Sequence, residues 1–149
     1  MKRKSIINQT LVSFVLFCSS IATFAQNELD ETKLVGFACF FEARETKVVS
    51  RFGKMLKHNR FESIKHRLQS ENPAERLMAV LCLERLSKVG RIAISAEEKT
   101  LIDKIKSSTE LVEVCSGCFV NPPIPLKEAF DSEILWRATA WLDAHVKGQ

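Results

Sequence analysis

The sequence feature that most constrains the fold is the run Leu77–Leu83, in which every side chain is apolar. Only Val80 in this run is β-branched, and its leucine, methionine and alanine residues favour helix over strand. We predict a single helix that includes this run and extends over residues 73–88. A helix that is apolar all round has to be covered on several sides. We therefore expect the other segments of the chain to be packed around it.

Both ends of this predicted helix carry residues that suit a helix terminus. Asn72 fits the N-cap, and Pro73 fits the first helical position, where no backbone N–H is needed. Glu75 stands three residues after Asn72 and is expected to close a capping box with it. Lys88 in the last turn and Gly90 just beyond it indicate where the helix ends.

The first 25 residues have the layout of a secretory signal peptide. A basic start at Lys2–Lys4 precedes a short apolar core at Leu11–Cys18 and a small-residue cleavage site that ends at Ala25. The apolar core is well short of the roughly 20 residues that a membrane-spanning helix needs. We predict cleavage after Ala25 and export of residues 26–149, to the periplasm or the outside, as one domain without a membrane span.

Removal of this leader changes the charge balance of the protein. The full chain has a formal net charge of +4, but Lys2, Arg3 and Lys4 supply three of these charges, which leaves about +1 for the mature chain. A chain of that charge has no general electrostatic attraction for nucleic acid or for an anionic membrane surface. Nucleic acid is therefore not an expected partner.

In the remaining segments, apolar residues recur at spacings of three and four, which predicts further helices. These are residues 34–56, as one helix or as two broken near Arg44, and then 61–68, 95–105, 111–118 and 131–148. The polar lead-in 26–33 is expected to be frayed, and three prolines make 121–125 an extended surface connector. The predicted fold class is all-α, a small stack of helical hairpins or an irregular helical bundle with a C-terminal capping helix.

Two of the predicted helix pairs, residues 61–86 and 95–118, look alike. Leu68 and Ile105 hold equivalent places 37 residues apart in the sequence. The first pair resembles a HEAT repeat, with Pro73 at the turn between the helices and with Arg76, Ala79, Leu83 and Leu86 in the second helix. The resemblance implies an α-solenoid scaffold for contacts with another protein, and it brings no catalytic residues.

Four cysteines remain after removal of the leader: Cys39, Cys82, Cys115 and Cys118. An even number in an oxidising compartment suggests disulfides, with three possible connectivities. Cys115 and Cys118 form a Cys-x-x-Cys motif with three open interpretations: a structural disulfide or two buried thiols, a redox pair, or zinc ligands completed by two of Cys39, Cys82, His58 and His66. Cys39 and Cys82 are expected to be core thiols, or to form a second bridge if their helices are adjacent.

Basic residues crowd the segment 47–67, where Glu62 is the single acid. The candidate contact face consists of Lys47, Arg51, Lys54, Lys57 and Arg60, and it continues to Lys65 and Arg67. It is either a face for an acidic partner or a solvated helix surface balanced by acids elsewhere in the fold. We expect all three histidines, at positions 58, 66 and 145, at the surface, with Trp141 in the core and Trp136 exposed.

The sequence contains no Ser-His-Asp grouping, phosphate loop or paired metal-ligand motif that stands out. We therefore assign no catalytic residue, cofactor or metal ligand. The leading hypothesis is a non-enzymatic, exported module that contacts another protein. The alternative hypothesis is a thiol–disulfide or metal-binding protein that acts through Cys115 and Cys118.

Overall fold

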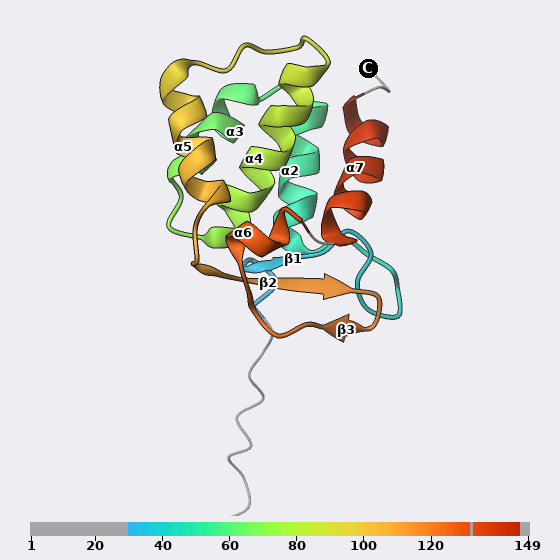
Figure 1. Ribbon diagram of the computed structural model, residues 1–149. Coiled ribbons are helices and arrows are strands. Elements are labelled where there is room, and N and C mark those ends of the chain that lie inside the picture. Colours follow the sequence, from blue (N-terminus) through green and yellow to red (C-terminus); the bar gives the residue numbers. More distant parts are fainter. Residues whose placement is uncertain (1–29, 132, 147–149) are drawn as a thin grey trace, which may run out of the picture.

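The computed structural model describes residues 30–131 and 133–146 of the chain (Figure 1). The predicted leader, half of the predicted lead-in (residues 26–29) and the expected helix end at Gly148 lie outside these residues. The elements follow in the order β1 (Leu34–Val35), α2 (Lys47–Lys57), α3 (Phe61–His66), the 3-10 turn η2 (Arg67–Gln69), α4 (Pro73–Lys88), α5 (Ala96–Lys106), β2 (Leu111–Ser116), β3 (Phe119–Val120), β4 (Ile124–Pro125), α6 (Leu126–Ala129) and α7 (Glu133–Val146). Within these residues, no helix is both long enough and apolar enough to cross a membrane.

The fold is α/β, so the prediction of an all-α stack of hairpins is wrong. A mixed four-stranded sheet has β2 as its central strand, with β1 parallel on one side and β3 and β4 antiparallel to it. The helices gather on one side of this sheet (Figure 1). The first of the two look-alike units does contain consecutive helices, α3 and α4, but the second is a helix followed by a strand. The resemblance to a HEAT repeat stays a prediction.

α4 is the central element of the molecule, as its apolar run predicts. Every side chain of Leu77–Leu83 is at most 5% exposed. The helix is in contact with α2, α3, α5, α6 and α7 and with strands β1 and β2. Its caps are only partly as expected: the Asn72 side chain accepts a hydrogen bond from the Ala74 N–H at 3.0 Å, but Glu75 does not close a capping box. The Glu75 carboxylate interacts with Arg51, Arg67 and Ser70.

Residues 111–118, predicted as a helix, form strand β2 and the turn after it. Val112 and Val114 are each 2% exposed and belong to the main core. Leu111, the residue before Val112, is 57% exposed. This alternation has the period of a strand, and valine is a strand-favouring residue. The helix prediction failed because it counted the apolar residues of both faces of the strand as one helical stripe.

The segment that begins at Leu34 is also extended where a helix was expected. Leu34 and Val35 form β1, which pairs with Glu113 and Val114 of β2. Between β1 and α2, Phe40 and Ala43 have φ values of 65° and 47°. No helix can continue through this left-handed backbone, and glycine, its usual sequence marker, is absent from both positions. The predicted helix therefore begins only at Lys47, and the part over residues 47–57 is confirmed as α2.

The proline-rich segment 121–125 is extended, as predicted, and its end belongs to the sheet. β3 and β4 lie in succession along β2, with Cys115 opposite Val120 and Val112 opposite Ile124. The register advances by one residue between the two short strands, so this edge of the sheet is interrupted as by a bulge. Prolines 122 and 123 fall in the interruption, where no ladder donor is required.

A disulfide between Cys39 and Cys115 closes the face of the sheet that points away from the helices, with a Cα–Cα distance of 5.9 Å. The bridge is buried together with Leu34 in a small second core, against which Phe40 is packed. Gly36 approaches it so closely that a Cβ atom there would come within 2.0 Å of the Cys39 Sγ atom. The disulfide therefore holds the loop before α2 against the central strand.

We expect removal of this disulfide to destabilise the fold strongly. The bridge joins residues 76 positions apart, and the chain-entropy cost that it removes from folding is about 4 kcal/mol for a loop of that length. In urea unfolding, the variant Cys39→Ala/Cys115→Ala should lose stability on that order. The exposed Cys118, which is outside the bridge, is the control: Cys118→Ser should change the free energy of unfolding by less than about 0.5 kcal/mol. Equal stability of the double variant and the native protein would contradict this role.

Candidate functional site

The structure contains neither of the two disulfides that the sequence suggested, one within the Cys-x-x-Cys motif and one between two predicted helices. Cys115 is bonded to Cys39, so neither the Cys115–Cys118 bridge nor the Cys39–Cys82 bridge is formed. Cys118 occupies the two-residue turn between β2 and β3 and is exposed, and Cys82 is buried in α4. Burial raises the pKa of the Cys82 thiol far above its ordinary value. A redox role for the motif stays a prediction.

The hairpin turn explains why Cys118 is separated from the disulfide. Ser116 pairs with Phe119, which leaves Gly117 and Cys118 as the loop, and Gly117 has a φ of 61°. A glycine with positive φ at the first of two loop positions is typical of a type II′ turn. No group of three or more His, Cys, Asp or Glu side chains within residues 30–131 and 133–146 is placed to share a metal ion. The zinc set considered for Cys115 and Cys118 is therefore not assembled there.

Four of the five residues of the candidate basic face lie on α2. Lys47, Arg51, Lys54 and Lys57 are all exposed and follow each other at spacings of four and three, so they share one side of the helix. Arg60 is also exposed and comes just after the helix. No acidic residue occurs in α2 itself. The structure thus places the predicted face along one helix, with one of its members tied to the core.

That member is Arg51, which forms an ion pair with the buried carboxylate of Glu75. Glu75 is 4% exposed and also accepts hydrogen bonds from Ser70 Oγ at 2.7 Å and from Arg67 Nη1 at 3.0 Å. Burial alone would raise the pKa of Glu75, but the Ser70 hydrogen bond and the charges of Arg67 and Arg51 outweigh it and hold the pKa below its ordinary value. Arg51 therefore links α2 to the start of α4, and its first role is in the fold.

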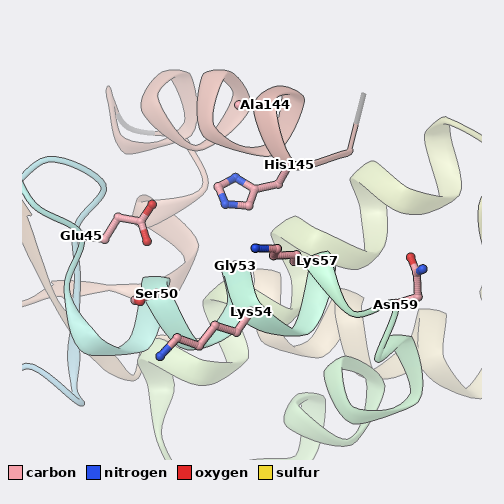
Figure 2. Close-up of a pocket in the computed structure, with 8 residues that line it drawn as sticks. All are labelled: Glu45, Ser50, Gly53, Lys54, Lys57, Asn59, Ala144 and His145. Atoms are coloured by element: carbon pink, nitrogen blue, oxygen red, sulfur yellow. The ribbon is translucent and has the colours of Figure 1, made fainter. Parts of the chain in front are cut away.

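A cavity with a volume of about 750 Å³ lies between α2 and α7. Its lining residues come from the end of the loop before α2, from α2 and the turn after it, and from α7: Glu45, Ser50, Gly53, Lys54, Lys57, Asn59, Ala144 and His145. Figure 2 shows Glu45, Lys57 and His145 directed toward the cavity from three different segments, whereas Lys54 extends away from His145. We name this cavity the α2–α7 cavity.

Trp141 contacts and positions two of the residues that line the cavity, Glu45 and His145. Its indole Nε1–H donates a hydrogen bond to Glu45 Oε1 at 2.8 Å. Its ring stacks against the imidazole of His145, with ring centroids 4.3 Å apart. Phe37, in the loop before α2, is also packed against the Trp141 ring, with a centroid distance of 5.5 Å. The buried tryptophan therefore positions a carboxylate and an imidazole that both line the cavity.

The hydrogen bond of His145 determines which of its nitrogens faces the cavity as an acceptor. Nδ1 lies 2.9 Å from the Trp141 backbone carbonyl oxygen. A carbonyl oxygen only accepts, so Nδ1 carries a proton and Nε2 holds the lone pair of the neutral ring. In Figure 2 the Nε2 side of the ring is turned into the cavity.

Gly53 lets α7 approach α2 closely enough for this arrangement. A Cβ atom at Gly53 would lie 3.1 Å from His145 Nε2 and 3.3 Å from the Trp141 ring, both tighter than ordinary contacts. A larger residue would push the imidazole away or fill the floor of the cavity. The glycine in the middle of a helix, which costs helix stability, has this packing function.

A second cavity of about 420 Å³ continues along α2 from the first. It is lined by Glu45, Lys47, Ser50, Arg51 and Lys54, so it shares three residues with the α2–α7 cavity. We call the two together the basic groove. The predicted basic face is thus one wall of a groove instead of a flat helix surface, and the other wall at one end is α7.

Sequence reasoning found the lysines of this groove but not the residues opposite them. Trp141 was correctly expected in the core and is 9% exposed, while His145, expected at the surface, is half-buried in the wall of the cavity. The signal that could have been used is the spacing of Trp141 and His145, which puts them on the same face of one helix. Glu45 carries no local signal, because its partner Trp141 is distant in the sequence.

Comparisons of the chain with family models, with curated proteins and with solved structures gave no match.

We expect Glu75 to stabilise the protein in a pH-dependent way. Because its pKa is lower in the folded state, its contribution is present above the ordinary value of 4.5 and is lost as the pH falls through the folded-state pKa. Glu75→Gln should lower the free energy of unfolding by about 2 kcal/mol at pH 7, the range of hydrogen bonds to charged groups. The difference from the native protein should shrink below about pH 4.5.

The matched control for this measurement is Glu62→Gln, because the Glu62 side chain is 80% exposed and its only ion pair among the described residues is with Lys65 of the same helix. Urea unfolding of this variant should differ from the native protein by less than about 0.5 kcal/mol at both pH values. A Glu75→Gln effect that is equally small, or that grows on acidification, would contradict the assignment.

Proposed function

We propose that the protein is an exported, non-enzymatic interaction module that binds an acidic segment of a partner polypeptide in the basic groove. The observation that carries this proposal is the composition of the groove. Lys47, Arg51, Lys54 and Lys57 follow one wall, and α2, which bears them, contains no acid. The carboxylate in the lining of both cavities is that of Glu45, and it accepts a hydrogen bond from Trp141 Nε1–H.

The shape of the groove supports a polypeptide segment as the ligand. The two adjoining cavities, of about 750 and 420 Å³, extend along the three turns of α2. Cavities of 300–1,000 Å³ are typical of ligand sites. Charged side chains spaced along an elongated surface attract a partner with charges of opposite sign at matching intervals. An acidic peptide in extended conformation has this property.

Export is supported by two features. The sequence begins with the layout of a signal peptide, and a disulfide such as Cys39–Cys115 persists in oxidising compartments. The disulfide and the absence of a spanning helix within residues 30–131 and 133–146 are compatible with an exported protein. The disulfide also bears on binding, because it anchors the loop that ends in Glu45.

The proposal predicts binding of an acidic peptide that depends on the groove lysines. The probe is a fluorescent decapeptide with alternating glutamates, acetylated at its N-terminus and amidated at its C-terminus, titrated by fluorescence anisotropy at low ionic strength. Lys47→Ala/Lys54→Ala should weaken binding about tenfold, which corresponds to two ion pairs of about 0.7 kcal/mol each. Binding should also weaken as salt is added, because the contacts are exposed and screened.

The control variant is Lys88→Ala/Lys99→Ala, which removes the same charge from exposed lysines on α4 and α5, outside the groove. Its affinity for the probe should stay within a factor of two of the native value. Failure of the native protein to bind, or equal weakening by the two double variants, would contradict the proposed site.

A further inference from the structure

We infer that the edge of strand β2 at Leu111 accepts an extended, basic segment of a partner polypeptide, which adds to the sheet as a further strand on the same side as β1. The inference follows from the incomplete pairing of β2, from an exposed leucine at the unpaired position and from the charges of the cavity beside it. It is independent of the proposed function, because this cavity shares no lining residue with the basic groove.

β1 covers only part of the strand that it pairs with. β2 has six residues, Leu111–Ser116, whereas β1 has two. The register places Leu34 opposite Glu113 and Val35 opposite Val114. Within the part of the chain that the structure describes, the first two residues of β2 therefore have no strand beside them on the β1 side.

A turn before β1 keeps this part of the edge open. Residues 31–33 form the turn, in which the Lys33 N–H donates a hydrogen bond to the Asp30 carbonyl oxygen at 2.9 Å. The Asn72 side-chain amide donates to the Thr32 carbonyl oxygen at 2.6 Å and so ties the turn to the start of α4. The strand direction of β1 is therefore not continued upstream along β2.

The backbone groups of Leu111 point to this open side. The carbonyl oxygen of the preceding residue, Glu110, accepts a hydrogen bond from the Leu126 N–H at 2.8 Å, on the β4 side of the strand. Successive residues of a strand direct their N–H and C=O groups to opposite sides, so those of Leu111 face the β1 side. No backbone group of residues 30–131 or 133–146 is bonded to them. An unpaired edge of this kind is a template for another strand.

The surroundings of the open edge suit a polypeptide ligand. The Leu111 side chain is 57% exposed, so an apolar contact is available next to the free backbone groups. A cavity of about 500 Å³ lies beside it, lined by Leu111–Glu113 of β2, by Lys33 and by the turn Glu71–Pro73. This volume is within the range that is typical of ligand sites.

The charges of this cavity select a basic segment. Its lysine, Lys33, is paired with Asp30 at 3.8 Å. Its two carboxylates, those of Glu71 and Glu113, have no salt bridge to any described residue. A lysine or arginine of the ligand is complementary to them, whereas the acidic segment proposed for the basic groove is repelled here.

The inferred ligand is therefore an extended segment in which apolar residues alternate with basic ones. Alternate side chains of a strand lie on opposite faces, so neighbouring residues of the segment meet different surroundings. In strand addition the main-chain hydrogen bonds supply affinity, and the alternate side chains supply specificity.

The experiment uses a hexapeptide in which valine and lysine alternate, acetylated and amidated at its ends and titrated against the full chain by calorimetry. Two further versions are N-methylated, one at every valine and one at every lysine, so that each loses the N–H donors of one edge. Only one edge of an added strand faces β2. We therefore expect one version to bind about tenfold more weakly than the unmodified peptide and the other to stay within about threefold of it.

Variants of the protein test the same contact from the other side. Leu111→Pro removes the free N–H at the first residue of β2, where proline is tolerated, and should weaken binding about tenfold. Leu111→Ala keeps the N–H and should weaken binding by about threefold or less. Glu71→Gln/Glu113→Gln should weaken binding about tenfold, whereas the control Glu62→Gln/Glu97→Gln, on α3 and α5, should stay within about twofold of the native affinity.

Amide hydrogen exchange reports on the edge directly. The Leu111 amide should exchange rapidly in the free chain and slowly when the peptide is bound. Protection of this amide in the free chain, no change on saturation, or equal affinities of the two methylated versions would overturn the inference. Self-association that Leu111→Pro abolishes would assign the edge to a second copy of the chain and overturn it as well. The acidic probe of the basic groove is titrated separately, so each of these results leaves the proposed function standing.

Discussion

The burial of α4 on every side is the constraint on which the rest of the structure depends. A helix whose run Leu77–Leu83 has no polar face cannot border solvent, and here five other helices and two strands cover it. The strands are needed because the helices gather on one side of the sheet and leave the end of α4 to β1 and β2 (Figure 1). The Cys39–Cys115 bridge then fixes the loop that follows β1 to the central strand.

The same packing creates the candidate site. α2 and α7 both lie against α4 and against each other, and Gly53 allows the two helices to meet at the ring of Trp141. Trp141 holds Glu45 and His145 at the cavity, while Glu75 of α4 holds Arg51 of α2 in place. The basic groove is thus formed by side chains whose neighbours belong to the core. A site supported in this way keeps its geometry in the absence of a ligand.

The parts that could be predicted from the sequence are those set by local signals. Asn72, Pro73 and the apolar run placed α4, and the spacing of apolar residues over 95–105 placed α5, which begins with a capping box between Ser95 and Glu98. Residues 111–116 were misassigned because a strand with two partly buried faces has the same composition as a short buried helix. The Cys39–Cys115 pairing, the contact of Trp141 with Glu45 and the role of Glu75 depend on residues that are far apart in the sequence, so no local pattern contains them.

Native-state hydrogen exchange is the most direct test of the central claim that α4 is enclosed by helices on one side and by the β1–β2 pair on another. The account predicts that the amides of Leu77–Leu83 exchange only through global unfolding, with a free energy of opening equal to the free energy of unfolding. The amides of Val112–Cys115 that pair within the sheet should be protected as well. Rapid exchange at Leu77–Leu83, or at β2 while the helices stay protected, would contradict it.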